Sequence, residues 1–272
     1  MITTLTPMSS SSGQEIDAAS KHVKFTQVVS QHPRTISKVF GLDQAGKLTR
    51  DWRVSRSKRT HSPTWGLDPR RAVSQRIGAD AKHADVDKDL DEARRFLAIL
   101  SSDAIFTFQT FAERANVSNP GALGRVFHGS FDEHAEALSV LNDRGAGVFF
   151  MVNRGDGQIR AGRKTCRTAE NVTAIRALFV DLDGSPVAPV YQWELAPTLV
   201  VESSPGRWHA YWLISGCPLG AFKELQKGLA EHFHGDVAVN DLGRVMRLPG
   251  FVHQKGKPFI PRIVIQKPGE QK

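Results

Sequence analysis

Cysteine, tyrosine and methionine are scarce in this sequence of 272 residues, which contains two, two and four of them. Cys166 and Cys217 have neither the spacing of a metal site nor a partner motif, so the default is a reduced thiol. No apolar run approaches the roughly 20 residues that a membrane-spanning helix needs. The N-terminal residues lack the basic and apolar regions of a secretory signal. We therefore expect a cytoplasmic protein.

The positive charge is confined to one part of the chain. Residues 1–84 contain 14 Lys and Arg against 6 Asp and Glu, whereas the rest of the chain contains 22 of each. A basic arm beside a neutral domain suits a polyanionic partner, because each phosphate contact releases counterions. We therefore predict a basic, partly disordered and largely extended arm over residues 1–87, a catalytic domain over 88–266 and a tail over 267–272. A small hairpin around residues 44–46 is expected within the arm.

Hydrophobic periodicity predicts a mixed order of helices and strands. Apolar residues recur at helical spacing in residues 89–100, 131–145 and 218–235. Alternating or continuous apolar runs predict strands at residues 106–111, 147–153, 174–181, 198–204 and 207–214, with shorter ones at 244–248 and 261–266. Because helices and strands are interspersed and a hairpin lies in the middle, the predicted fold class is α+β.

Two acids stand at the end of an apolar strand. In Phe-Val-Asp-Leu-Asp-Gly, Asp181 and Asp183 are two residues apart, and residues two apart on a strand point to the same face. Adjacent carboxylates repel one another unless a cation lies between them. Hard, oxygen-binding ions such as Mg²⁺ or Mn²⁺ suit this pair.

A second motif follows in a predicted hairpin turning at Pro205-Gly206. Its return strand carries Arg207 and His209 on one face, and Ser204 precedes the turn. Arginine can grip a triphosphate through a charge-assisted fork and histidine through a single donor. The aromatic residues of the same strand, Trp208, Tyr211 and Trp212, are expected to pack in the core rather than to stack on bases.

A third motif combines acids and cations. Asp236 and Asp241 precede Arg247-Leu-Pro-Gly-Phe, and Lys255 follows it. An acid near a basic residue, a rigid Pro-Gly turn and a further lysine would supply a metal ligand beside phosphate contacts.

Taken in order, the three motifs resemble those of the archaeo-eukaryotic primase (primase-polymerase) superfamily and, within it, the RepB-type replication primases. The resemblance covers roughly residues 90–265, and Arg-Leu-Pro-Gly-Phe is its most specific part. It implies a primase-polymerase core, an RRM-like antiparallel sheet with packed helices. It also implies a DNA primase, a nucleotidyltransferase that makes primers on single-stranded DNA for plasmid or phage replication.

The resemblance also implies roles for individual residues. Asp181, Asp183 and Asp236 would hold the catalytic Mg²⁺ or Mn²⁺ ions, with Asp241 as the second candidate for the third acid. His209 would contact the phosphates of the nucleoside triphosphate. Further phosphate contacts would come from Ser204, Arg207, Arg247 and Lys255. A helicase, if priming requires one, would be a separate chain.

Two other functions compete with this interpretation. Asp181-Leu-Asp183-Gly also resembles the first motif of haloacid-dehalogenase-type phosphohydrolases, in which Asp181 would be the nucleophile. That fold needs a helix after Ser203, where the sequence predicts a hairpin. A non-catalytic DNA-binding replication protein is the other alternative. His232 and His234 match the two-histidine motif of rolling-circle endonucleases but are not expected to converge on a metal.

One further segment is a decoy. Residues 157–165 nearly spell a phosphate-binding P-loop, but Arg163 stands where that motif requires lysine. No ATPase motor is therefore expected from this segment.

Overall fold

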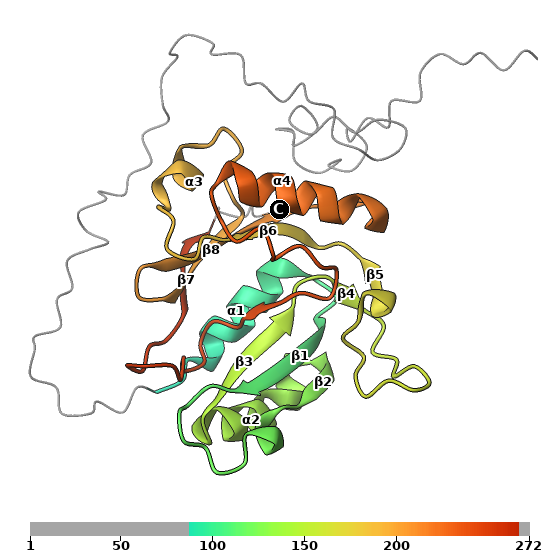
Figure 1. Ribbon diagram of the computed structural model, residues 1–272, viewed down its shortest axis with the longest axis vertical. Coiled ribbons are helices and arrows are strands. Elements are labelled where there is room, and N and C mark those ends of the chain that lie inside the picture. Colours follow the sequence, from blue (N-terminus) through green and yellow to red (C-terminus); the bar gives the residue numbers. More distant parts are fainter. Residues whose placement is uncertain (1–86, 267–272) are drawn as a thin grey trace, which may run out of the picture.

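The computed structural model describes residues 87–266, so the predictions made for the arm, its hairpin and the tail lie outside the described residues, apart from Asp87. The described chain forms two four-stranded antiparallel sheets (Figure 1). The first sheet has the order β2 (Val126–Ser130), β1 (Ile105–Ala112), β3 (Ala146–Met151) and β9 (Val245–Arg247). The second has the order β10 (Arg262–Gln266), β7 (Leu199–Ser204), β8 (Arg207–Leu213) and β6 (Ala177–Asp181).

Helices and short elements complete the domain. The α-helices are α1 (Leu90–Leu100), α2 (Phe131–Asp143), α3 (Ala188–Gln192) and α4 (Phe222–His232). A two-stranded ribbon joins β4 (Arg154–Gly155) to β5 (Val172–Ala174). Short 3₁₀ turns occupy Pro120–Leu123, Ala169–Asn171 and Leu219–Ala221. The sequence missed α3, β2 and the ribbon, which are too short for a clear periodic pattern.

Helix α1 joins the two sheets. It begins where the Asp89 side chain accepts a hydrogen bond from the Glu92 amide at 2.9 Å, which caps the first turn. The Phe96 ring lies 5.1 Å from the ring of Phe150 on β3 and 5.5 Å from that of Tyr211 on β8. These three rings are fully buried, so one hydrophobic core spans both sheets and α1.

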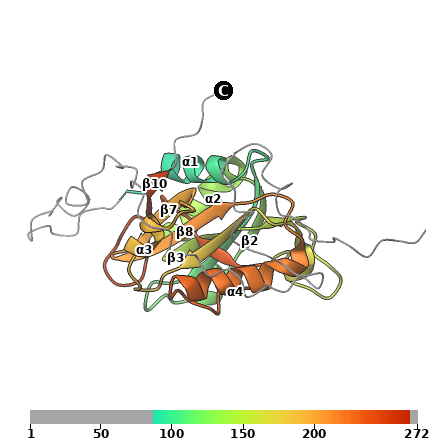
Figure 2. The same ribbon diagram turned by 90° about the horizontal axis from the view of Figure 1, so that it is seen from above.

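Helices α2 and α4 pack on different sheets. The capping box of Ser130 and Glu133 begins α2, which packs on the first sheet. Helix α4 packs along β6, where its buried Gln226 side chain hydrogen-bonds the backbone of Phe179. In Figure 2, α1 and α4 lie on opposite sides of the strands. The α4 face predicted from the sequence, which includes Phe222 and Leu229, is buried as expected.

The predicted hairpin is confirmed. Strands β7 and β8 are joined at Pro205-Gly206, where Gly206 has φ +72°, a conformation that favours glycine. Strand β8 also pairs with β6, so that Asp181 stands directly opposite His209. Two of the three predicted motifs thereby meet at one end of the second sheet.

Strand β9 brings the third motif to the first sheet. Its register places Arg247 opposite Phe149 of β3. The following Pro-Gly turn then packs against the start of α1. Gly250 has φ +86°, and a Cβ there would lie 2.1 Å from the Asp89 carbonyl oxygen, so this position of the motif requires glycine.

The observed topology confirms the α+β prediction and excludes the phosphohydrolase alternative. A haloacid-dehalogenase fold is a doubly wound parallel sheet, whereas every strand pair among residues 87–266 is antiparallel. The P-loop-like residues 157–165 are irregular apart from a turn at 161–162, and the element that follows them is a 3₁₀ turn rather than an α-helix.

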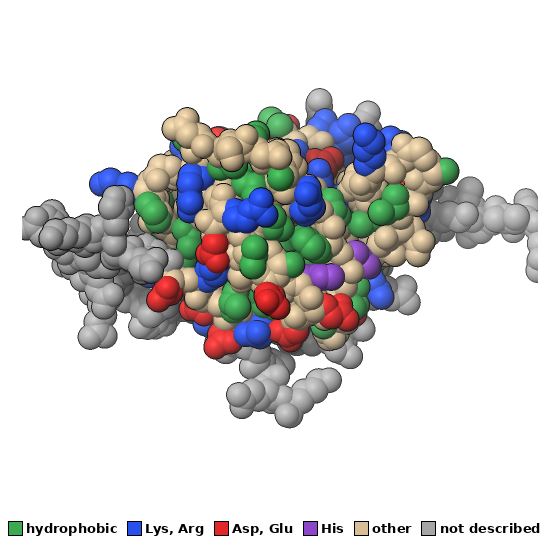
Figure 3. Space-filling view, turned by 90° about the horizontal axis from the view of Figure 1, so that it is seen from below, with side chains coloured by type: hydrophobic (Ala, Val, Ile, Leu, Met, Phe, Trp, Pro, Cys, Tyr) green, Lys and Arg blue, Asp and Glu red, His purple; other side chains and the backbone are tan. Residues whose placement is uncertain are grey.

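The surface of the domain shows a separation of charge. On the face in Figure 3, Lys and Arg side chains lie across the centre with hydrophobic side chains between them, and Asp and Glu gather along the lower edge. Within residues 87–266, no helix has the length and apolarity needed to cross a membrane.

Candidate active site

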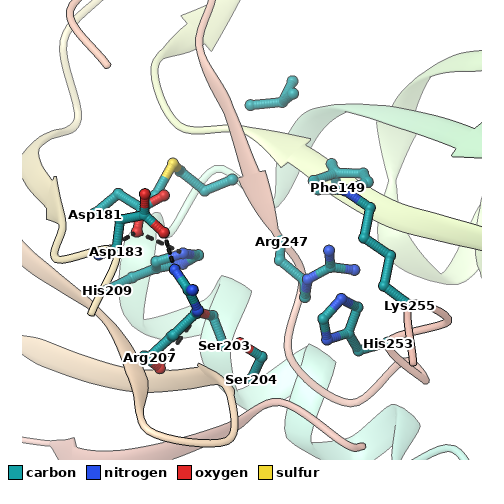
Figure 4. A pocket seen from close by; sticks show the side chains of 12 residues that line it. Phe149, Asp181, Asp183, Ser203, Ser204, Arg207, His209, Arg247, His253 and Lys255 are labelled. Atoms are coloured by element: carbon teal, nitrogen blue, oxygen red, sulfur yellow. Dashed lines mark hydrogen bonds and ion pairs between the residues drawn. The ribbon is translucent and has the colours of Figure 1, made fainter. Parts of the chain in front are cut away.

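A pocket of about 460 Å³ is lined by residues of both sheets. The ends of β6, β7 and β8 supply one side of it, and β3, β9 and the segment after β9 supply the other. Figure 4 shows Asp181, Asp183 and His209 grouped on the first side and Arg247, His253 and Lys255 on the second. The two sides therefore carry different chemistry, and we describe them as the acidic side and the basic side.

The acidic side begins at the end of β6. Asp181 is the last residue of the strand, and Asp183 lies beyond it in a turn with φ +39°. The expectation that both acids lie on one strand is therefore wrong. The turn nevertheless keeps both carboxylates in the pocket, because the Asp183 amide donates to Asp181 Oδ1 at 3.1 Å. Aspartate tolerates this left-handed conformation better than most residues.

His209 is buried behind the acids. Its side chain lies with Nε2 3.8 Å from Asp181 Oδ1 and Nδ1 3.4 Å from the Tyr211 hydroxyl oxygen. Burial lowers the pKa of His209 from 6.5 to about 4, although the Asp181 charge opposes this shift. At neutral pH this imidazole is uncharged, so it can contact a phosphate as a neutral donor.

Arg207 and Ser204 complete the acidic side. Arg207 forms an ion pair with Asp183, and both side chains are largely exposed. An exposed ion pair of this kind contributes little to stability and separates readily. Ser204 lines the pocket near the start of β8, as does Ser203, whose hydroxyl donates to the Arg207 carbonyl oxygen at 3.4 Å.

The backbone of Asp236 contacts the backbone of Asp181, but Asp236 does not line the pocket. Its amide donates to the Asp181 carbonyl oxygen at 2.8 Å, and its own carboxylate accepts from the Ala238 amide at 2.8 Å. Gly235 permits this approach, since a Cβ there would lie 2.4 Å from Val180 Cγ2. Two predicted metal ligands thus face the pocket and the third adjoins them.

Asp241, the other candidate for the third acid, is ion-paired with Arg244 at 2.7 Å and does not line the pocket. Among residues 87–266, no three His, Cys, Asp or Glu side chains are grouped so that they would hold a metal by themselves.

Arg247 dominates the basic side, but its charge is already paired. Its two terminal nitrogens donate to the carboxylate of Glu113 at 2.9 and 2.6 Å, and its guanidinium lies 4.8 Å from the Phe149 ring centroid. Burial disfavours the charge of Glu113, yet the hydrogen bonds and charge of Arg247 outweigh it and keep the Glu113 pKa below its usual value. Gly147 leaves room for this carboxylate, because a Cβ there would lie 2.3 Å from it.

Lys255 and His253 line the rest of the basic side. Lys255 is exposed and has no acidic partner within residues 87–266. Burial lowers the pKa of His253, and the charges of Arg247 and Lys255 lower it further while Glu113 opposes them. Lys255 is therefore the accessible cation on this side of the pocket.

Three residues at the basic side were not predicted from the sequence: Glu113, Phe149 and His253. Glu113 is 134 positions from its partner Arg247, so no local pattern connects them. His253 is two residues before Lys255, and this spacing is the only signal that marks it.

The histidines of the endonuclease alternative do not converge. His232 lies at the end of α4 against the Trp193 ring, 5.2 Å between centroids, whereas His234 is exposed with φ +55°. Endonucleases of that class also need a tyrosine nucleophile, but Tyr211 is fully buried beside His209, and Tyr191 lies on α3 and does not line the pocket.

Comparison with known families identifies the region that contains this pocket. Residues 155–267 match the RepB DNA-primase N-terminal domain. The resemblance to a RepB-type DNA primase that the motifs predicted is thereby confirmed over these residues. The matched residues include both pocket acids, the His209 hairpin and Lys255. A search of curated proteins found no match.

Three solved structures are similar to this chain. The primase-polymerase domain (PP-N190) of cyanophage S-2L has 20% identity and a TM-score of 0.49, with 66% of this chain and 91% of that chain covered. The catalytic domain of primase RepB′ in complex with initiator DNA has 19% identity and a TM-score of 0.45, covering 66% and 86%. A second structure of primase RepB′ has 18% identity and a TM-score of 0.43, covering 65% and 56%.

Proposed function

We propose that this primase synthesises primers on single-stranded DNA by template-directed nucleotidyl transfer in the pocket between the two sheets. The observation that carries the proposal is the division of the pocket, with two carboxylates on one side and Lys255 on the other. A nucleoside triphosphate combines a polyanionic chain, which needs cations, with a reacting phosphorus that needs metal ions. Both requirements are met within one cavity of about 460 Å³.

The pocket acids fit a divalent metal. Asp181 and Asp183 offer hard oxygen ligands from adjacent positions, and Mg²⁺ is usually held by one or two carboxylates together with waters and substrate phosphates. Such a site needs no cage of three or more protein ligands. We propose Asp181 and Asp183 as the ligands of Mg²⁺ or Mn²⁺, with Asp236 as the third acid because its backbone adjoins Asp181.

The remaining residues orient the nucleotide. Arg207 can exchange Asp183 for a phosphate, since their ion pair is exposed. Ser204 and the neutral His209 add hydrogen-bond donors, and Lys255 neutralises phosphate charge from the basic side. Arg247, held by Glu113, acts as a fixed positive group at the pocket wall.

The reaction is the attack of a hydroxyl oxygen on the α-phosphorus. A new P–O bond forms to the 3′-oxygen of the primer or of the first nucleotide, the bond between the α-phosphorus and pyrophosphate breaks, and the hydroxyl proton passes to solvent water. Bound metal ions would lower the pKa of the attacking hydroxyl and neutralise charge on the departing pyrophosphate. The chain itself aligns the two substrates, which is the larger part of catalysis in phosphoryl transfer.

We further propose the biological setting that the family resemblance implies. The primase would act in the cytoplasm on the replication of a plasmid or phage, with nucleoside triphosphates as substrates and a separate helicase as a possible partner. The basic excess of residues 1–84 supports an additional contact with the phosphates of DNA.

A template-dependent extension assay tests this function. With single-stranded DNA, nucleoside triphosphates and Mg²⁺ or Mn²⁺, the full chain should make short products. Asp181→Ala and Asp183→Ala should abolish them, whereas Glu136→Ala, which removes an exposed acid on α2, should not. Synthesis that survives both pocket substitutions would refute the proposal. DNA binding without synthesis by the wild type would identify a non-catalytic binding module instead.

A further inference from the structure

Two phenylalanine rings lie together on the face of the first sheet that points away from the core. Phe106 and Phe108 of β1 and Phe150 of β3 are buried in the core, so Phe111 and Phe149, at odd positions of the same strands, point to the opposite face. The Phe111 and Phe149 ring centroids are 5.4 Å apart with an interplanar angle of 66°. Phe111 is 39% exposed. We call these two rings the aromatic pair.

Two arginine side chains lie against the aromatic pair, and a third follows Phe111 in the sequence. The guanidinium of Arg247 lies 4.8 Å from the Phe149 ring centroid, and that of Arg167 lies 6.0 Å from the Phe111 ring centroid. Arg114, three residues after Phe111, is exposed and hydrogen-bonds Gln254, the neighbour of Lys255. Of these arginines, Arg247 is paired with Glu113, whereas Arg167 and Arg114 have no acidic partner among the described residues. Apolar rings beside such arginines form a surface that suits a ligand with both flat apolar faces and negative charges.

The aromatic pair is continuous with the proposed active site. Phe149 lines the pocket, and Figure 4 shows it beside Lys255 on the side away from the two aspartates. Phe111 is not among the pocket-lining residues and extends the surface outward by one ring. A ligand on Phe111 would therefore enter the pocket across Phe149.

We propose that the aromatic pair is a stacking surface for bases of the single-stranded DNA template where it enters the pocket. Every base has a π-face, so stacking on aromatic rings is tolerant of sequence, while cations beside the rings hold the backbone phosphates. A primase must accept many templates, and this mode of binding meets that need. The inference rests on the proposed function and adds to it the position of the template.

The position of Phe111 favours the template over the incoming nucleotide. A nucleotide with its phosphates between Lys255 and the two acids occupies the pocket itself, where Phe149 is the only ring of the aromatic pair. A ligand that contacts both Phe149 inside the pocket and Phe111 outside it must extend beyond the pocket, as a DNA strand does. Tyr211 and Trp212, on the other sheet, are buried and offer no such surface.

The test compares binding of two oligonucleotides by the full chain. Fluorescence anisotropy would measure the affinity for a labelled deoxythymidine oligonucleotide and for one of the same length with abasic sites, without nucleotide or metal. Phe111→Ala should weaken binding of the first about tenfold, as expected for the loss of one base stack, and leave binding of the second unchanged. Phe111→Trp should restore it.

A matched control is available at Ile159, which is 66% exposed and does not line the pocket. Ile159→Ala should bind both oligonucleotides as the wild type does. Equal losses for the base-containing and abasic oligonucleotides, or no loss in Phe111→Ala, would overturn the stacking surface. So would a rise in the nucleotide KM of Phe111→Ala without a change in oligonucleotide affinity.

The two proposals can fail separately. If the wild type makes primers but Phe111→Ala binds DNA normally, only the stacking surface is wrong. If Phe111→Ala loses base-dependent binding but the wild type makes no primers, the surface stands as a DNA-binding site and primer synthesis is refuted. Circular dichroism of each variant verifies that the fold is retained, as expected at an exposed position.

Discussion

The two sides of the pocket hold their charged groups in different ways. On the acidic side, Asp183 and its partner Arg207 are exposed and can exchange partners. On the basic side, Arg247 and Glu113 are nearly sequestered, with 11% and 4% of their side chains exposed. In the proposed function the acidic side can therefore receive substrate and metal, whereas the buried ion pair of the basic side links strand β9 to the end of β1. On the basic side, Lys255 is the residue that is exposed and can contact a ligand, as Asp183 and Arg207 can on the acidic side.

This difference explains why similar residues have different predicted effects. Arg247 and Lys255 belong to the same motif and were both expected to contact phosphates. The structure separates them, because Arg247 has two charge-assisted hydrogen bonds to Glu113 and Lys255 has no acidic partner among the described residues. Substitution of Arg247 should change stability first, and substitution of Lys255 should change substrate binding alone.

The largest expected effect concerns Asp236, which adjoins the acidic side and is the proposed third acid. Asp236→Asn should reduce primer synthesis by roughly a thousandfold, since a metal contributes several kcal/mol of charge stabilisation and each 1.4 kcal/mol is tenfold in rate. Asp241→Asn is the matched control, because Asp241 is paired with Arg244 outside the pocket. Product yield in the extension assay measures both. If Asp241→Asn abolished synthesis and Asp236→Asn did not, Asp241 would be the third metal-binding acid.

The second prediction concerns the loss of the buried Glu113–Arg247 ion pair on the basic side. Glu113→Gln leaves the Arg247 charge buried without its partner and should lower the free energy of unfolding by about 3 to 5 kcal/mol. Urea denaturation measures this change, and Asp91→Asn, at an exposed ion pair with Arg94, should change it by less than about 1 kcal/mol. Replacing both Glu113 and Arg247 by leucine should recover most of the stability. Similar decreases in the free energy of unfolding in Glu113→Gln and Asp91→Asn would contradict the distinction between the buried and the exposed ion pair.

The third prediction uses pH to examine His209. Its pKa is about 4 in the folded protein and near 6.5 when exposed, so below pH 6.5 the unfolded chain binds a proton that the folded one excludes. Stability should therefore fall by about 3 kcal/mol as the pH decreases from 6.5 to 4. His209→Gln should reduce this slope, as measured by denaturation at several pH values. An unchanged slope would show that other groups cause it.

The smallest expected effect concerns the accessible cation. Lys255→Gln should raise the KM for nucleotide about fivefold at low salt, because an exposed lysine contributes at most about one charge-pair interaction. The effect should shrink as salt screens it. Lys257→Gln, two residues further along and outside the pocket, is the matched control. Equal effects of both substitutions would mean that only net charge matters.

Much of this could be predicted from the sequence because the relevant signals are local. The apolar periods of α1, α2 and α4, the Pro-Gly turn of the hairpin and the α+β order follow from short-range patterns. The acids, His209, Arg247 and Lys255 were found because each stands in a motif of a few residues. Residues 155–267, where these motifs lie, are also the part that matches the RepB-type primase domain.

Tertiary structure decided what lies opposite each motif. Strand β9 returns to the first sheet and brings Arg247 to Glu113 and Phe149, which precede it by more than 90 positions. The turn after β6 alters the direction of Asp183, and Gly235 lets the Asp236 backbone reach Asp181. Such contacts depend on the packing of distant strands, which no local pattern encodes. By itself, the sequence determined which chemical groups are present, and the fold decided which of them remain free to act.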